Sequence, residues 1–241
     1  NSWLPSTSKV RPSRSREAAA GIYMNLAHNM HLNVEGYYKH MYNLLEYAGI
    51  YNVFPPLEDW ESSYKMGNGR SWGGEIDFGY DNGRTEANLY YTLSWTQRKF
   101  DDFHRGWYPD RNDNRHKLTL MAKHKFGKRF EIYGAWNWHS GNRVTMATHK
   151  SANGDYIYTE PNNVKLPDYH RLDVGMNFVK TTKRGNTSIW NLSIYNAYCR
   201  TNPITAEVYS RTLKAEETFA YYGVAIGIIP IVPTFSYTLK F

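Results

Sequence analysis

The sequence has a single cysteine, Cys199, and no long apolar run. One cysteine excludes a disulfide framework and any zinc site built from several thiolates, and we interpret Cys199 as a packed, inert thiol. No stretch approaches the roughly 18 apolar residues of a transmembrane helix. This excludes a helical membrane protein, but it leaves open a transmembrane β-barrel, whose sequence signal is a much weaker alternation.

The chain also lacks an initiating methionine, a signal peptide and any cluster of charge of one sign. We therefore expect a processed chain or a fragment of a longer protein. The net charge is +7, but the Lys and Arg residues are spread over nearly every segment. This pattern favours solvated loops and a wet lumen, and it argues against a nucleic-acid partner, which would need a basic patch.

Aromatic side chains are the feature that the chain has in excess. Its 241 residues include 21 Tyr and 8 Trp, although the mean hydropathy is -0.68. Tyr and Trp collect where apolar and wet surroundings meet. The composition therefore favours a protein that lies at such a boundary.

Alternation of apolar and polar residues predicts an all-β fold of nine strands. Met41 and Leu44 could extend a helix, but the tyrosines around them favour a strand. The predicted strands are 16–26, 31–47, 64–80, 84–100, 118–126, 130–138, 172–178, 187–195 and one long final strand in 219–241, bent near Pro230 and Pro233.

Short and long connections alternate along the chain. The short ones are 27–29, 81–83 and 127–128, and the long ones are 49–63, 101–114 and 140–168. Outer-membrane barrels have short periplasmic turns and long extracellular loops, whereas a soluble sandwich has no reason to sort its loops by length. We expect 140–168, the longest connection, to be functional or flexible.

The end of the chain reads IPIVPTFSYTLKF and alternates strictly. Phe235, Tyr237, Leu239 and Phe241 fall on one face of a strand. This ending resembles the closing strand of a bacterial outer-membrane barrel, in which the last aromatic residue is part of the signal read by the assembly machinery. Nine strands then end at the periplasmic side, so we count 219–241 as one strand, because two strands would leave Phe241 outside.

Nine segments together resemble the TonB-dependent outer-membrane receptors, in a form typical of Bacteroidetes. Each segment is weakly specific alone, and their order and spacing carry the likeness over essentially the whole chain. The segments are 8–12, 34–39, 67–75, 92–94, 98–100, 140–142, 166–173, 193–198 and 233–241.

The resemblance implies an antiparallel transmembrane β-barrel of roughly 22 strands that is filled by a plug. Residues 1–241 would be its C-terminal part, without the plug and the first strands. Nine strands alone would leave two unpaired edges, which lipid does not tolerate. The implied partners are the plug and N-terminal strands of the same receptor, the TonB complex acting through the plug, outer-membrane lipid, the barrel assembly machinery and, as a further candidate, a surface lipoprotein.

Alternation also predicts which side chains face lipid. A charge on the lipid face is costly, whereas the lumen is wet. We expect an outward set of Leu118, Leu120, Phe130, Ile132, Leu192, Ile194, Tyr237 and Leu239, and an inward set of Lys117, Lys123, Glu131, Asn191 and Lys240.

Aromatic and charged residues in the long connections are the candidates for ligand contact. Tyr and Trp supply rigid stacking area, and Arg binds carboxylates or phosphates bidentately, as capture of a siderophore, glycan or peptide needs. The predicted residues are His104, Arg105, Trp107, Tyr108, Arg111, Arg143, Tyr156, Tyr158 and His170.

No motif points to catalysis, a metal or a cofactor. The nine His show no HExxH pattern and no spacing typical of zinc. Gly67–Gly74 is followed by a strand rather than a helix, so a phosphate cradle is disfavoured, and we expect these glycines beneath aromatic rings of the wall. Nothing singles out a serine nucleophile, and we predict no enzyme activity.

We therefore predict an outer-membrane active-transport receptor. One alternative is a passive outer-membrane porin or adhesion barrel, which would lack an upstream plug. Another is a soluble carbohydrate-binding β-sandwich, which would not partition with the membrane.

Overall fold

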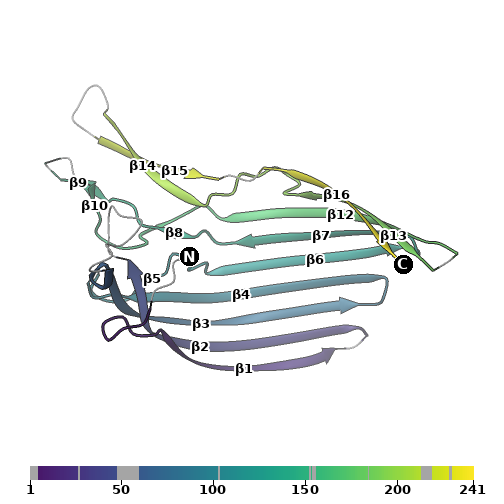
Figure 1. Ribbon diagram of the computed structural model, residues 1–241, viewed down its shortest axis with the longest axis horizontal. Helices are drawn as coiled ribbons and strands as arrows, with labels where there is room; N and C mark the ends of the chain where they lie inside the picture. Colours follow the sequence, from purple (N-terminus) through teal and green to yellow (C-terminus); the bar gives the residue numbers. More distant parts are fainter. Residues whose placement is uncertain are drawn as a thin grey trace.

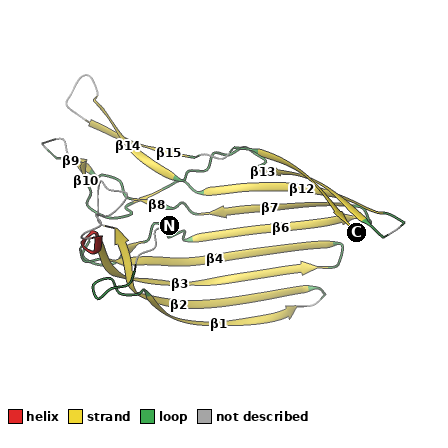
Figure 2. Ribbon diagram, viewed as in Figure 1, coloured by secondary structure: helices red, strands yellow, loops and turns green. Residues whose placement is uncertain are grey.

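The computed structural model describes residues 5–26, 28–47, 60–102, 104–151, 153, 156–183, 185–212, 219–227 and 230–241. Figure 2 shows that these residues form strands and loops, apart from one short 3-10 helix at Trp60–Ser63. No helix among them is long and apolar enough to span a membrane.

Nine strands form one antiparallel sheet in the order β1-β2-β3-β4-β6-β7-β12-β13-β16, and β5 adds a short pairing to β4 (Figure 1). Each strand except the last pairs with the next strand of this wall along the chain, as expected for consecutive hairpins. The bounds are β1 Arg14–Leu26, β2 Met30–Tyr47, β3 Tyr64–Asp81, β4 Thr85–Lys99, β5 Tyr108–Pro109, β6 His116–Phe126, β7 Phe130–His139, β12 Tyr169–Thr181, β13 Thr187–Tyr195 and β16 Val232–Lys240.

The predicted alternation of short and long connections is confirmed. The hairpins β1–β2, β3–β4, β6–β7 and β12–β13 turn at one end of the sheet, on the right of Figure 1, and the strand ends that the long connections join lie at the other end. At the β3–β4 turn the Asn82 side chain accepts the N–H groups of Arg84 and Thr85 at 3.0 and 2.7 Å. Gly83 has φ 81 there, a conformation that glycine adopts without strain.

The long connections contain further short strands. These are β8 Arg143–Val144, β9 His149–Lys150, β10 Tyr156–Ile157 and β11 Val164–Lys165, which form two small sheets, β8 with β11 and β9 with β10. The segment 140–168 therefore has secondary structure of its own beyond the end of the wall.

The prediction of one long strand over 219–241 is wrong. This segment forms two strands, β15 Phe219–Ile226 and β16, and β15 pairs with β14 Thr205–Thr212 in a separate hairpin. Pro230, between β15 and β16, cannot donate a ladder hydrogen bond, which favours a break at that point. Because the hairpin adds two strands, the direction of β16 is unchanged, and the C-terminus lies at the short-turn end as expected (Figure 1).

The strand register confirms the predicted division into two faces. Cross-strand partners point to the same side of a sheet. Leu120 pairs with Leu89 and Trp136, and this row continues through Leu172. Lys123 pairs with Glu86 and Tyr133 on the opposite face. All residues of the predicted outward set share the first face, called here the outer face, and all of the inward set share the second, the inner face.

On this sheet many large apolar side chains are exposed, whereas in a soluble protein most of them are buried. Among the described residues the buried hydrophobic side chains are Val10, Phe100, Tyr108 and Leu166, whereas Ile22 and Phe235 on the outer face are 65% and 62% exposed. Every Asp and Glu of the nine wall strands lies on the inner face. An apolar face of this extent with no carboxylate requires an apolar environment.

The expectation of aromatic rings over the glycines of 67–74 is confirmed at one position. A Cβ on Gly67 would lie 2.6 Å from Cγ of Phe100, which is fully buried. Gly73 instead faces the backbone and Cβ of Ser94 on the neighbouring strand. Because Gly73 has no side chain, β4 can approach β3 closely there, and the nearest atoms belong to β4 rather than to an aromatic ring.

Candidate ligand-binding site

A cavity of about 870 Å³ lies at the long-connection end of the sheet. Its volume is within the range of small-molecule sites. Four tyrosines line it, and two of them, Tyr47 and Tyr64, have ring centroids 5.4 Å apart. The lining residues are Leu45, Glu46, Tyr47, Tyr64, Arg98, Asp102, Tyr108, Arg111, Thr145, Tyr158, Thr159, Glu160, Pro161 and Asn162.

Arg98 anchors the side of the cavity that the wall provides. It lies on the inner face of β4, and its Nη1 donates to Glu46 Oε2 at 2.7 Å. Its Nε donates to Asp110, whose side chain is 6% exposed. Asp110 Oδ1 also accepts the N–H of Asn112 at 2.8 Å. The Arg98 guanidinium thus links β4 to β2 and to the β4–β6 connection. Glu46 and Arg98 are 52 residues apart in the sequence.

A β-bulge in β2 brings Glu46 to this position. The register with β3 shifts between Met41 and Leu44, which puts Glu46 opposite Lys65 on the inner face. Asn43, inside the bulge, has φ 55 and donates from its side chain to the carbonyl of Pro12 at 3.1 Å. An extra residue reverses the faces of all that follow it. The bulge therefore turns a carboxylate toward Arg98.

Tyr108 lies between these charges. Burial raises its pKa to about 12, the carboxylates of Glu46 and Asp110 add to the shift, and Arg98 opposes it. The phenol consequently stays protonated at physiological pH and keeps its hydrogen-bond donor.

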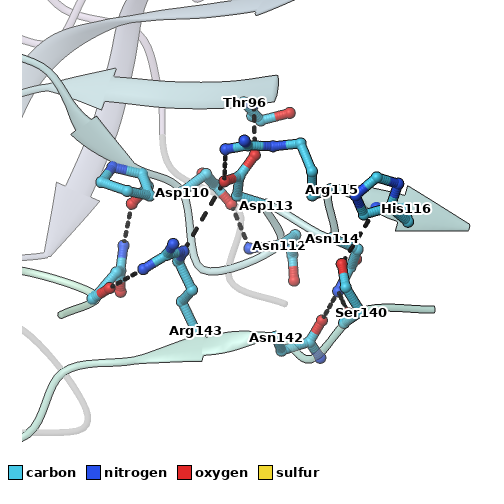
Figure 3. Close-up of polar contacts among 12 residues, drawn as sticks. Thr96, Asp110, Asn112, Asp113, Asn114, Arg115, His116, Ser140, Asn142 and Arg143 are labelled. Atoms are coloured by element: carbon cyan, nitrogen blue, oxygen red, sulfur yellow. Dashed lines mark hydrogen bonds and ion pairs between the residues drawn. The ribbon is translucent and has the colours of Figure 1, made fainter. Parts of the chain in front are cut away.

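A second network holds the connections in place, and Figure 3 shows it around Asp113. Asp113 Oδ1 accepts the N–H of Thr96 at 2.9 Å, which ties the connection to β4. Asp113 Oδ2 lies 3.1 Å from Arg115 Nη2 and 3.8 Å from Arg143 Nε. The Asp113 side chain is 3% exposed, so a nearly buried carboxylate joins both long connections.

Asn114 extends this network toward β7 (Figure 3). Its amide donates to the carbonyl of Ser140 at 3.1 Å and to Asn142 Oδ1. The Ser140 hydroxyl accepts the N–H of His116 at 3.2 Å. The connections 101–115 and 140–168 therefore form one hydrogen-bonded body above the strand ends.

The far end of 140–168 is closed by Asp168. Its Oδ1 accepts the N–H of Gly141 at 3.1 Å and lies 2.9 Å from Lys165 Nζ. Burial alone would raise the pKa of Asp168, but the hydrogen bonds from Lys165 and Gly141 lower it overall. The two ends of this connection are thus tied by an ionised carboxylate.

The structure brings together three of the predicted ligand contacts. Tyr108, Arg111 and Tyr158 line the cavity. His104 lies beside Tyr108 with ring centroids 5.9 Å apart. Arg143 is directed to the structural network, where it contacts Asp113 and donates to the carbonyl of Asn162 at 3.4 Å.

Four predicted contacts lie elsewhere. Trp107 stacks beneath Arg70, 4.4 Å from the guanidinium carbon to the ring centroid, on the outer face. His170 shares the outer face with Trp138. Its ring bonds Tyr198 Oη at 2.7 Å. Tyr156 lies in the small β9–β10 sheet, and Arg105 is exposed and does not line the cavity.

Sequence reasoning missed several lining residues at the strand ends, above all Glu46, Tyr47, Tyr64 and Arg98. The signal available was the density of Tyr near the ends of two predicted strands. Among the described residues, no group of three or more His, Cys, Asp or Glu could hold a metal ion, and the absence of a metal or cofactor stays a prediction.

Compared by sequence, the chain matches no protein-family model and no curated protein. Compared by structure, it is similar to the pyoverdine outer membrane receptor FpvA from Pseudomonas aeruginosa PAO1 bound to pyoverdine, with a TM-score of 0.60 and 15% identity over 96% of this chain. The ferripyoverdine receptor of the P. aeruginosa outer membrane bound to ferripyoverdine gives 0.59 and 13%. FpvA bound to a heterologous pyoverdine gives 0.59 and 14%.

The chain spans 30% of the first of these receptors and 28% of the other two. They are TonB-dependent outer-membrane receptors, and they are not enzymes. At this level of identity the likeness shows the fold. The nine-stranded sheet has the fold of a section of an outer-membrane receptor barrel, in agreement with the receptor-barrel part of the resemblance.

Proposed function

We propose that residues 1–241 form the C-terminal part of a TonB-dependent receptor barrel that captures a nutrient for active transport across the outer membrane. The 870 Å³ cavity at the long-connection end is the observation that carries this proposal. It is built from strand ends and two connections that a buried polar network holds together. A site on rigid elements is suited to selective capture.

The cavity chemistry supports a polar, ring-containing or peptide-like ligand. Tyr47, Tyr64, Tyr108 and Tyr158 offer aromatic faces and phenol groups. Carboxylates and guanidinium groups lie beside them, so both donors and acceptors are available. A siderophore, a glycan and a peptide all fit this description, and the class of nutrient remains the subject of the test.

Transport would need the rest of the receptor. In this proposal the plug and N-terminal strands complete the barrel, the TonB complex acts through the plug, and a surface lipoprotein is a candidate partner. The barrel assembly machinery would read Phe235, Tyr237, Leu239 and Phe241. The first three of these residues share the outer face of β16. The Bacteroidetes form of the receptor is proposed on the sequence segments alone.

The test is uptake by the full-length receptor in a strain that lacks its own copy. Ferric siderophores, oligosaccharides and peptides are supplied in turn as the sole source of iron or carbon. We expect Tyr108→Ala and Tyr158→Ala to weaken binding of the transported compound roughly tenfold or more, as loss of a central aromatic contact does. Tyr198→Ala, an exposed tyrosine that does not line the cavity, is the matched control.

Equal affinity in the cavity variants and the control would contradict the assignment of the site. Uptake that continues without TonB would favour the alternative of a passive porin or adhesion barrel. The two outcomes are independent, because the first concerns ligand binding and the second concerns the energy source of transport.

A further inference from the structure

Four basic side chains form a patch on the outer face near the long-connection end. Arg16 pairs with His40, and His40 pairs with Arg70, so these three lie in one row across β1, β2 and β3. Arg14 lies two residues further along β1 on the same face, opposite Tyr42. We call Arg14, Arg16, His40 and Arg70 the outer basic patch.

The patch lies at the border of the apolar face. On β2 the outer face runs from Met30 to Tyr38 before it reaches His40. The ten residue-to-residue steps from Met30 to His40 span about 33 Å along the strand, or about 25 Å of height for a strand tilted by about 40°. This height matches the apolar band of an outer-membrane barrel, so the patch lies at the level of lipid headgroups.

Aromatic rings hold the patch in position. The Trp72 and Trp95 rings are stacked, with centroids 5.9 Å apart, directly below the row. Arg70 lies 4.4 Å from the Trp107 ring centroid and 5.3 Å from that of Trp72. Its Nε donates to Gln97 at 2.8 Å, so its Nη groups are left for another acceptor. Such stacking restricts the guanidinium without neutralising it.

The patch has no counter-charge within the described part of the protein. None of the acidic residues of the wall strands lies on the outer face. The inner-face cations differ, because Lys39 pairs with Glu17 at 3.2 Å and Lys123 pairs with Glu86 at 2.5 Å. Cations without carboxylates at headgroup level are complementary to an anion supplied by the membrane.

The shape of the surface agrees with a bound headgroup. A hollow of about 640 Å³ is lined by Arg14, Ser15, Arg16, Tyr42 and Asn43. The guanidinium carbon of Arg16 lies 6.0 Å from the Tyr42 ring centroid. Two arginines of β1, the edge strand of the described sheet, thus line the hollow.

We propose that the outer basic patch binds a phosphate-bearing lipid headgroup of the outer leaflet. Arg14 and Arg16 would bind the phosphate at the hollow, and Arg70, stacked on Trp107, would bind a second phosphate or a second lipid along the row. The proposal rests on an outer-membrane location and does not involve the ligand cavity.

The experiment uses the full-length receptor in detergent and native mass spectrometry. Diphosphoryl lipid A is titrated, with phosphatidylcholine and inorganic phosphate as comparison probes. Each juxtamembrane arginine contributes about fivefold to binding of anionic lipid, so Arg16→Gln with Arg70→Gln should weaken lipid A binding about 25-fold. The control pair Lys117→Gln with Arg129→Gln removes the same charge from the inner face and a turn, and it should change binding less than about twofold.

Three results would overturn the proposal. They are equal affinities for the two double variants, lipid A binding no tighter than phosphatidylcholine, and full displacement of lipid A by inorganic phosphate at an equal concentration, which would indicate a free-anion site. Heat-modifiable migration checks that every variant is folded. Binding of the nutrient should be unchanged in the patch variant reconstituted in lipid vesicles, so a failure of the lipid proposal is distinct from a failure at the cavity.

Discussion

An arginine at position 120 tests which face of the sheet meets lipid. Leu120 is 39% exposed on the outer face, where it pairs with Leu89 and Trp136. The next residue, Met121, is 45% exposed on the inner face opposite Asn88. Leu120→Arg and Met121→Arg therefore add the same charge to the same strand at adjacent positions, one to each face.

The expected difference between these variants is large. An arginine on the lipid face near the bilayer midplane destabilises the folded barrel by about 2 to 4 kcal/mol. An arginine that faces a wet lumen destabilises it much less. This corresponds to about 30-fold to about 700-fold in the folding equilibrium of the barrel. Lys123→Leu, which removes an exposed inner-face ion pair with Glu86, should have a smaller effect than Leu120→Arg.

The measurement is the fraction of heat-modifiable, folded barrel in purified outer membranes relative to total full-length receptor, followed by urea unfolding in lipid vesicles. We expect Leu120→Arg to lower both the folded fraction and the urea midpoint, and Met121→Arg to stay near the parent protein. Equal losses for the two arginine variants would refute the division of the sheet into a lipid face and a lumen face. A larger loss for Met121→Arg would reverse it.

Three further predictions concern orientation, assembly and the cavity. In a Cys199→Ser background, a cysteine at Arg105 should react with a membrane-impermeant label on intact cells and one at Asn82 should not, and the reverse result would contradict the orientation. Phe241→Asp should lower the heat-modifiable fraction of the full-length receptor while Phe241→Tyr has a mild effect, and an unchanged ratio for the Asp variant would contradict an assembly signal. Asp113→Asn should increase tryptic cleavage within 140–168, because it removes the charge that holds Arg143, and unchanged cleavage would show that the network does not order this connection.

Local patterns were sufficient to predict the wall and its two faces. Alternation depends only on neighbours in sequence, so 118–126 and 130–138 could be assigned as strands with their faces. The turn at Asn82 and Gly83 is equally local. It depends on the Asn82 side chain, which accepts the N–H of Arg84, and on the positive φ of Gly83. The hairpin pairings β1–β2, β3–β4 and β6–β7 then follow from the short connections.

The hairpin β14–β15 was not predicted for a different reason. It is not part of the wall, so the count of strands that the barrel requires gave no indication of it. The parity argument also could not detect it, because a hairpin returns the chain to the same end of the sheet. The single long strand 219–241 satisfied the same parity and was therefore chosen in error.

The members of the candidate site were only partly predictable, because their contacts are non-local. Arg98 meets Glu46 and Asp110 across the ends of different strands, and sequence alone does not show that meeting. The position of His170 could have been found, however. It has the same parity as Leu172 and Val174 of the predicted strand 172–178, so extending the alternation of that strand by two residues would have placed His170 on their face.

The bulge in β2 links the wall to the cavity above it. Without the register shift after Met41, continued alternation would direct Leu45 rather than Glu46 to the inner face. Arg98 would then face a side chain that cannot accept its Nη1 hydrogen bond, while Asp110 would be its remaining carboxylate partner. Strand β2 thus keeps its alternation along the apolar outer face and changes it by one residue where that apolar stretch ends. This single change lets the same β-strand contribute apolar side chains to the outer face and an ion pair to the candidate site.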